Sequence, residues 1–551
     1  MPIHTTRISL RVILPVMVFI LLLALLALSL YLINKPPEIL RLDPSTALPG
    51  ERIKIYGKNF GDEKDGSEII IAGIKPTNSN YISWSDDKIV LEVPDDVKSG
   101  RLFVRTGEGK SNGPLFINKE YVPVVIEGPA KPGEPYIRNI SPIKGSVGQE
   151  VTIEGLNFGL SQGEGKVFFS FYSGSSEKED TSEDNFIECS SLDFDYKSWS
   201  SQRIIIFVPD GATSGALKVK TDRGESNFVY FEVVNPYGTK LYGQKRGYQI
   251  QYSVAISDIV QEGDTGEITL WIPGVYRNQA QRSIEAVFDP NPMWENYKGL
   301  MMYQIKNIEP WIQYKFSHTY WFERYTVETD INAQRINKNY NTERKLYTYY
   351  TDENIFTPVK DKTISDIAYS VTKREKNPYI KAEKIYNYLL KRLEYDQDSD
   401  SLSPLEAIGK RKGDAYDYAI LFTSLTRSAK VPARTVAGYL VYGNKQTRKH
   451  WWSEFYIDGV GWIPVDAALG DGMDITGLKL PDNPVKYYFG NVDNQRIIFS
   501  KGLIDIESIN PDGKIVRKNR SYSMQTVYEE YSDSIKSYKS SWSDIQVVDW
   551  W

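Results

Sequence analysis

The pattern of apolar and polar positions changes character several times along the chain. Residues 12–33 form an uncharged apolar run, long enough at about 1.5 Å per residue to cross the ~30 Å hydrocarbon core of a bilayer. Short alternating segments such as residues 52–56 then predict β-strands as far as about residue 359, and helical spacing begins near residue 377. This order predicts a multidomain chain: a transmembrane helix, all-β domains, and a final α+β domain.

The apolar run predicts a single-pass membrane anchor. Arg7 and Arg11 precede it and Lys35 and Arg41 follow it, so the charge bias is weak. Because the tail before the run is short and the remainder is large, we expect residues 1–35 to form a cytoplasmic tail and a transmembrane helix, with the bulk outside the cytoplasm. The alternative is a cleaved signal peptide that ends near residues 27–29.

Two copies of one β pattern follow the anchor. Residues 44–61 align without a gap on residues 142–159, at an offset of 98. Further along, residues 93–95 match residues 208–210 at an offset of 115, which places a 17-residue insertion in the second copy. Short strands separated by Gly, Pro and Asn turns are typical of β-sandwiches.

Both copies resemble the IPT/TIG family, whose fold is immunoglobulin-like. The resemblance rests on Asn-Phe-Gly at 59–61 and 157–159 and on the two Val-Pro-Asp turns. It implies two domains, residues 36–120 and 135–235, which the proline-containing linker 121–134 joins into a stalk. We interpret Trp84 and Trp199 as core residues, and Cys189 as an inert thiol.

Residues 238–360 continue as a β-rich domain. Segments 268–273, 286–288 and 311–316 alternate or run apolar at strand length, and we interpret His318 as structural.

Composition narrows the function classes. A net charge of -5 gives no basic surface for nucleic acid. A single cysteine excludes intramolecular disulfides, which favours a bacterial cell envelope over a disulfide-rich secreted protein. The acidic loop 396–400 lacks the glycine and glutamate of a calcium loop, so we predict a solvated loop there and no metal site. We also expect no cofactor.

Helical signals then become strong. Asn377 is a good N-cap and Pro378 a good first helical residue. Ala382, Ile385, Tyr386 and Leu389 recur at helical spacing and predict a buried stripe.

A second helix and a hairpin carry the candidate chemistry. Residues 413–419 open the helix, residues 432–434 read Pro-Ala-Arg, and His450 and Asp466 lie on either side of the turn Asp458-Gly459. A two-residue turn would put the His450 and Asp466 side chains on opposite faces of the sheet. We therefore predict a three-residue loop or a bulge, which brings them to one face.

These residues resemble the transglutaminase-like superfamily, which has a papain-like fold and a Cys-His-Asp triad. The resemblance implies a domain at residues 365–500, followed by a C-terminal extension, residues 501–551. It places His450 and Asp466 as the triad histidine and aspartate, and Ala415 where the nucleophilic cysteine belongs. It also implies a cleft for an extended peptide, with Trp452, Tyr416 and Trp451 as candidate lining residues.

Such catalysis needs a thiolate, an imidazole that moves the proton and a carboxylate that orients the imidazole. The thiolate is missing here, because Ala415 has only a methyl group at the position of the nucleophile. Thr423 and Ser424 lie about 12 Å further along the helix at 1.5 Å per residue, and Cys189 belongs to another domain.

Three hypotheses follow. The first is a membrane-anchored pseudoenzyme that binds a protein or peptide or acts as an envelope scaffold. The second is an active cysteine hydrolase or transamidase in which Ala415 is an introduced or strain-specific change. The third is an adhesion or structural protein that works through its Ig-like domains.

Overall fold

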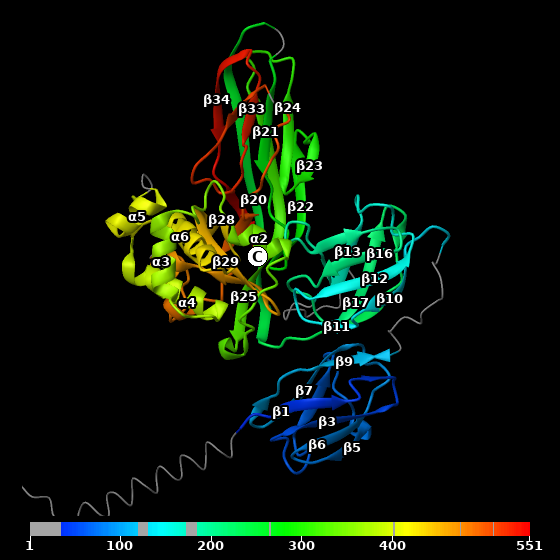
Figure 1. The fold of residues 1–551 in the computed structure, drawn as a ribbon. Helices are drawn as coiled ribbons and strands as arrows, with labels where there is room; N and C mark the ends of the chain where they lie inside the picture. The colour runs from blue at the N-terminus through cyan, green and yellow to red at the C-terminus, as the bar shows by residue number, and fades with distance from the viewer. Residues whose placement is uncertain are drawn as a thin grey trace, which may run out of the picture. The chain divides into compact units, whose positions relative to one another are not determined.

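The computed structural model describes residues 35–119, 131–171, 185–263, 266–399, 403–473, 475–510 and 512–551. The chain divides into two compact units, residues 1–125 and 126–551 (Figure 1). The predicted transmembrane segment, residues 12–33, lies outside the described residues. Within the described ranges, no helix is long and apolar enough to cross a membrane.

The first unit contains an Ig-like β-sandwich. One sheet has the strand order β1-β3-β6-β5, and the other has β2-β9-β7-β4 with β8 paired to β7. Alternate residues of β3 point into the sandwich, so Ile53 and Ile55 are fully buried while their neighbours face outward. The elements are β1 (Glu38–Asp43), β2 (Thr46–Ala47), β3 (Arg52–Lys58), β4 (Glu68–Ile71), η1 (Asn78–Asn80), β5 (Tyr81–Trp84), β6 (Lys88–Glu92), β7 (Gly100–Thr106), β8 (Gly109–Lys110) and β9 (Leu115–Asn118).

The second unit begins with another Ig-like sandwich that repeats the first. Its sheets have the orders β10-β12-β16-β15 and β11-β19-β17-β13-β14, with β18 paired to β17. The indole N–H of Trp84 donates to the carbonyl of Phe60, and that of Trp199 donates to Phe158, so the repeat extends to single hydrogen bonds. The strands are β10 (Tyr136–Ser141), β11 (Lys144–Gly145), β12 (Glu150–Leu156), β13 (Lys166–Ser170), β14 (Phe186–Glu188), β15 (Tyr196–Trp199), β16 (Arg203–Phe207), β17 (Gly215–Thr221), β18 (Gly224–Glu225) and β19 (Val229–Val233).

Much of the predicted insertion in this second sandwich lies in residues 172–184, outside the described ranges. Cys189 is buried in the sandwich core, and burial raises the pKa of its thiol well above the ordinary value. The cysteine is therefore a core residue.

A β-rich region follows, built on two long strands. β20 (Gly238–Gln261) pairs antiparallel with β25 (Tyr314–Ile331) in a sheet of order β22-β25-β20-β34, to which β35 also pairs through β20. A second sheet has the order β23-β24-β21-β33-β32. The remaining strands are β21 (Ile268–Pro273), β22 (Gln281–Asp289), β23 (Trp294–Tyr297), β24 (Leu300–Ile305), β32 (Lys514–Val516), β33 (Glu529–Tyr531), β34 (Ile535–Trp542) and β35 (Gln546–Trp550).

The last four of these strands belong to the segment that the sequence separates as a C-terminal extension. They complete both sheets of the β-rich region, so these four strands, which lie between Lys514 and Trp550, are part of that region's fold. The predicted strand at 311–316 is wrong in its first half, because β25 begins at Tyr314 and Trp311 is 81% exposed in a turn. His318 is buried between the hydroxyls of Tyr252 and Tyr303, and burial lowers its pKa to about 3, as suits a structural residue.

The α+β domain packs helices against one face of a sheet of order β30-β29-β28-β31 (Figure 1). Phe455 and Ile463 of the sheet join the helical core, whereas Tyr439 and Phe499 join the core of the β-rich region. The elements are η4 (Ala333–Arg335), α2 (Lys345–Thr351), α3 (Lys362–Thr372), α4 (Pro378–Arg392), β26 (Glu394–Tyr395), α5 (Pro404–Lys410), β27 (Lys412–Gly413), α6 (Ala415–Ser428), β28 (Ala433–Tyr442), β29 (Gln446–Ile457), β30 (Gly461–Val465), α7 (Ala467–Gly470), α8 (Pro484–Tyr487) and β31 (Arg496–Lys501).

The helix predicted from Asn377 and Pro378 is confirmed. The Asn377 side chain accepts from the backbone N–H groups of Tyr379 and Ile380, and Pro378 is the first residue of α4. All four residues of the predicted stripe are buried.

Candidate functional site

The site is organised around the first turn of α6. Asp414 caps the helix by accepting from the backbone N–H of Asp417, and the Asp417 carboxylate accepts from the N–H of Asp414 in return. Ala415 is the first helical residue and is 3% exposed. Gly413 precedes the cap, and a Cβ there would lie 2.9 Å from the Cβ of Asp417. The tight turn therefore places position 415 at a helix N-terminus, where the peptide dipoles favour negative charge.

The hairpin of β29 and β30 brings the candidate dyad together. Ile457 pairs with Gly461, which leaves a three-residue loop, residues 458–460, with Gly459 at φ 87°. The predicted odd-numbered loop is confirmed. His450 and Asp466 consequently share a face, and His450 Nε2 lies 2.7 Å from Asp466 Oδ2.

Asp466 has three partners. Its Oδ2 accepts from Nη1 of Arg496 at 2.9 Å as well as from His450, and its Oδ1 accepts from the backbone N–H of Leu469. Burial acts to raise the pKa of Asp466, but His450, Arg496 and the Leu469 amide outweigh burial and hold it below the ordinary value. The carboxylate is therefore ionised, and Nε2 is the ring nitrogen that donates to it.

His450 is fully buried. Its side chain and that of Asp466 are both 0% exposed, and the imidazole stacks on Trp452 with centroids 6.0 Å apart and planes 22° from parallel. The second ring nitrogen, Nδ1, is buried and has no hydrogen-bond partner among the described residues. Since Nε2 is engaged with Asp466, Nδ1 is the atom that would take a proton from a nucleophile.

The three residues expected to line an open cleft are instead buried. Trp452 is 1%, Trp451 6% and Tyr416 9% exposed. Tyr416 packs edge-on against Trp451 at 5.4 Å, and Arg496 lies 4.9 Å from the ring of Trp452. That these three residues line a cleft stays a prediction, and in this structure their side chains are covered by neighbouring residues.

Part of that covering comes from the C-terminal strap, residues 517–524. Arg520 forms ion pairs with Asp414 at 2.5 Å and Asp417 at 2.9 Å, and its guanidinium lies over the ring of Tyr416. The indole N–H of Trp451 donates to the carbonyl of Ser521 at 2.9 Å. The strap therefore contacts residues on either side of position 415.

Comparison with known families agrees with this geometry. Residues 365–467 match the Transglutaminase-like superfamily, and residues 37–117 and 135–233 each match the IPT/TIG domain. The chain contains a transglutaminase-like domain and two IPT/TIG domains.

Individual relatives are distant. An uncharacterized protein of Haemophilus influenzae is 24% identical over 289 residues, which span 42% of this chain and 73% of that protein. A candidate cysteine protease from Cytophaga hutchinsonii is similar at 15% identity and a TM-score of 0.37, covering 57% of this chain and 92% of that one. The periplasmic domain of TgpA from Pseudomonas aeruginosa is similar at 12% identity and a TM-score of 0.21, covering 56% and 88%.

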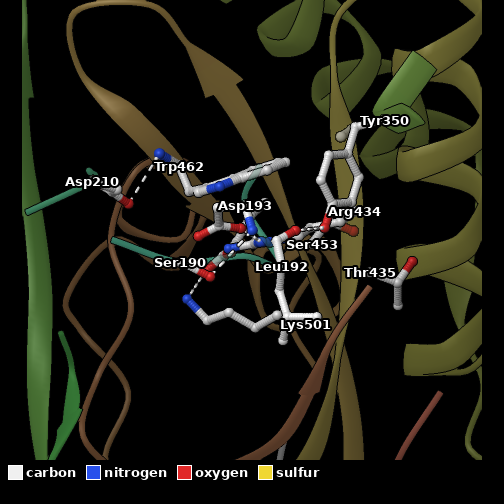
Figure 2. Close-up of polar contacts among 12 residues, drawn as sticks. Ser190, Leu192, Asp193, Asp210, Tyr350, Arg434, Thr435, Ser453, Trp462 and Lys501 are labelled. Atoms are coloured by element: carbon white, nitrogen blue, oxygen red, sulfur yellow. Dashed lines mark hydrogen bonds and ion pairs between the residues drawn. The ribbon is translucent and has the colours of Figure 1, made fainter. Parts of the chain in front are cut away.

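Sequence reasoning missed the charged residues that connect the transglutaminase-like domain to its surroundings. Arg434, the arginine of Pro-Ala-Arg, is 1% exposed and forms ion pairs with Glu454 of its own sheet and Asp193 of the second Ig-like domain. Figure 2 shows Asp193 beside Arg434, with Trp462 close by. The guanidinium lies 3.8 Å from the centre of the Trp462 ring.

A second contact joins the same two domains at the hairpin. Asp210 accepts from the backbone N–H of Trp462 and forms a buried ion pair with Lys240 (Figure 2). Gly461 has φ 93°, and a Cβ there would lie 2.1 Å from the Asp210 carboxylate, so only glycine allows this approach. The second Ig-like domain is thus bound to the transglutaminase-like domain, and the prediction that it forms a simple stalk needs correction.

Proposed function

We propose that the protein is a membrane-anchored, extracytoplasmic scaffold whose transglutaminase-like domain is non-catalytic and binds a protein or peptide. The observation that carries this proposal is a methyl group at position 415, where the nucleophile would be, in a domain whose His-Asp dyad is fully buried. The membrane anchor rests on the apolar run at residues 12–33, and the ligand class rests on the resemblance to the superfamily.

The chemistry of the site supports a non-catalytic role. Thioester formation needs a sulfur lone pair, which the Ala415 methyl lacks. A triad carboxylate also stabilises the imidazolium that forms when histidine takes the proton. Here the Asp466 carboxylate is shared, because it accepts from Arg496 as well as from His450, and Arg496 in turn pairs with Asp493. The dyad therefore serves to tie β29, β30 and β31 together.

The C-terminal strap supports the same conclusion. A substrate that approached the start of α6 would have to displace Arg520 from both Asp414 and Asp417. Binding through a surface of the module requires no such displacement, which favours a scaffold over a cryptic enzyme.

Restoring the thiol tests this proposal. We expect the full-length Ala415→Cys protein to show no amidase, peptidase or transamidation activity. We also expect the new thiol to react with iodoacetamide only after denaturation, because position 415 is buried. Wild-type protein is the matched control, since its one cysteine, Cys189, is also buried. Rapid alkylation at neutral pH, together with hydrolysis that His450→Ala abolishes, would mean that a working site had lost only its sulfur.

The wild-type protein provides a separate check. Turnover of a peptide or isopeptide by wild-type protein that is lost in His450→Ala would refute the non-catalytic proposal outright.

Anchoring is tested independently. We expect the full-length protein to sediment with membranes, to need detergent for extraction, and to be digested by protease added to spheroplasts. Recovery in the soluble fraction without detergent would contradict the anchor.

A further inference from the structure

The sheet built on β20 and β25 has an open edge at β22. This strand ends the sheet on one side, and over residues 285–289 it pairs with β25 in a regular register that finishes with Asp289 opposite Ser317 (Figure 1). In an antiparallel edge strand, every second residue points its N–H and C=O away from the sheet. Among the described residues, none outside β25 forms a hydrogen bond with the backbone of residues 285–289.

The outer face of this edge carries an acidic row. Glu285 and Asp289 are exposed on either side of Val287, whose side chain is 58% exposed, and alternation along the strand puts all three on one face. Neither carboxylate forms an ion pair with a residue in the described ranges. The edge therefore presents two unpaired negative charges with an apolar side chain between them.

The inner face of the same segment leaves apolar surface uncovered. Ala286 is exposed, and Phe288 is only partly buried although its ring packs edge-on against His318 and Tyr320 of the core. A strand added beside β22 would cover both side chains, and burial of apolar surface is favourable.

We propose that residues 285–289 of β22 bind an extended basic segment of a partner protein as an additional strand. The open backbone groups supply main-chain hydrogen bonds, and the alternate side chains select the sequence. The segment presents basic side chains to Glu285 and Asp289 and an apolar side chain to Val287. This surface lies in the β-rich region, so its test does not depend on whether the transglutaminase-like domain is catalytic.

The acidic row argues against two other occupants. If two copies of the chain paired antiparallel through β22 and centred on Val287, each Glu285 would face an Asp289, and like charges directly opposite are destabilising. The insertion of the second Ig-like domain has the same sign, with five acidic residues and one lysine in residues 177–184. A basic segment is therefore the occupant that the charges favour.

Peptide binding tests the charge complementarity. The peptide Thr-Lys-Leu-Val-Leu-Lys-Thr, when extended, presents Lys, Val and Lys on one face and two Leu on the other. Titration calorimetry should show that it binds the full-length protein in detergent, and that Glu285→Lys combined with Asp289→Lys weakens binding at least about tenfold. The double variant should instead bind Thr-Glu-Leu-Val-Leu-Glu-Thr, which the wild-type protein should not.

The matched control makes the same change of charge where no backbone edge is open. Glu328 and Asp330 are also exposed, but their part of β25 pairs with β20, and the N–H of Thr329 between them already donates to Asn491. Glu328→Lys combined with Asp330→Lys should bind the lysine peptide as the wild-type protein does.

Methylated peptides test strand addition itself. One form of the lysine peptide carries N-methyl groups on its two Leu amides, and the other carries them on its Lys and Val amides. A strand added to one edge uses only one of these sets, so one form should lose binding and the other should keep it. Hydrogen exchange should also show that residues 285–289 gain protection when the unmodified peptide binds.

Three results would overturn the proposal. If the lysine peptide does not bind the wild-type protein, the acidic residues only protect the edge from pairing. If binding persists in the double variant at 285 and 289, or responds equally to both methylated forms, the peptide binds elsewhere or without forming a strand. A wild-type oligomer that dissociates in the double variant during sedimentation would assign the edge to a second copy of the chain.

Discussion

The two Ig-like domains share one sequence pattern but have different surroundings. Asp95 and Asp210 occupy the same position of the Val-Pro-Asp turn, yet Asp95 is exposed and Asp210 is buried against Lys240. The sandwich cores are alike because the repeat preserves the buried apolar positions. The difference shows that a repeated core predicts the fold of each copy, whereas the partners of a polar residue such as Asp210 are not predicted by the repeat.

Among substitutions that test this difference between the two Ig-like domains, Arg434→Met should have the largest effect on stability. It removes a partner of the buried Glu454 carboxylate and the partner of the Asp193 carboxylate, whose side chain is 14% exposed, which should lower the free energy of unfolding of the second unit by about 3–5 kcal/mol. Hydrogen-exchange mass spectrometry should show lost protection in peptides from both β28 and the second Ig-like domain.

Lys119→Met is the control in the first Ig-like domain, because the Lys119–Glu51 pair is exposed. It should leave protection unchanged. A similar loss of protection in both variants would mean that burial of the pair does not distinguish the two domains.

A smaller loss of stability is expected from a substitution in the Val-Pro-Asp turn that both Ig-like domains contain. Asp210→Asn keeps a hydrogen-bond acceptor but removes the charge that faces Lys240, so we expect a loss of about 1.5–3 kcal/mol from the second unit. Asp95→Asn makes the same chemical change at the equivalent exposed position and should have no measurable effect. Urea unfolding of both variants measures the two losses of stability. Equal shifts of the unfolding midpoint would contradict the claim that only Asp210 has a stabilising partner.

The smallest loss of stability is expected at the two equivalent tryptophans, and it should be equal in the two Ig-like domains. Trp84→Phe and Trp199→Phe each remove one indole hydrogen bond to a backbone carbonyl, at a cost of about 1 kcal/mol. Hydrogen exchange in each domain measures the two losses separately. Clearly unequal losses would show that the neighbours of the second domain alter its core as well as its surface.

Local signals predicted the elements that depend on local chemistry. The Asn377 cap, the buried stripe of α4 and the three-residue loop before Gly461 each follow from residues close together in sequence. The pairing of His450 with Asp466 could be predicted for the same reason, because a single hairpin joins the two residues.

Ion-pair partners that lie far apart in the sequence could not be predicted from local sequence signals. Arg496 lies 30 residues from Asp466, Arg520 lies 103 from Asp417, and Arg434 lies 241 from Asp193. Nothing in the sequence near either member of these pairs points to the other. The burial of Trp451 and Tyr416 was unforeseen for the same reason, since Ser521 and Arg520 of the distant strap contact them.

The pairing of the last strands with β20 has a consequence for synthesis of the protein. Tyr248 lies opposite Trp550, so the central sheet of the β-rich region cannot close until residue 550 has been made. The first Ig-like domain, by contrast, contains all its strands within residues 38–118 and can fold while translation continues. The second sandwich likewise has its strands within residues 136–233, so an emerging chain would carry both sandwiches ahead of a segment that awaits residues 546–550.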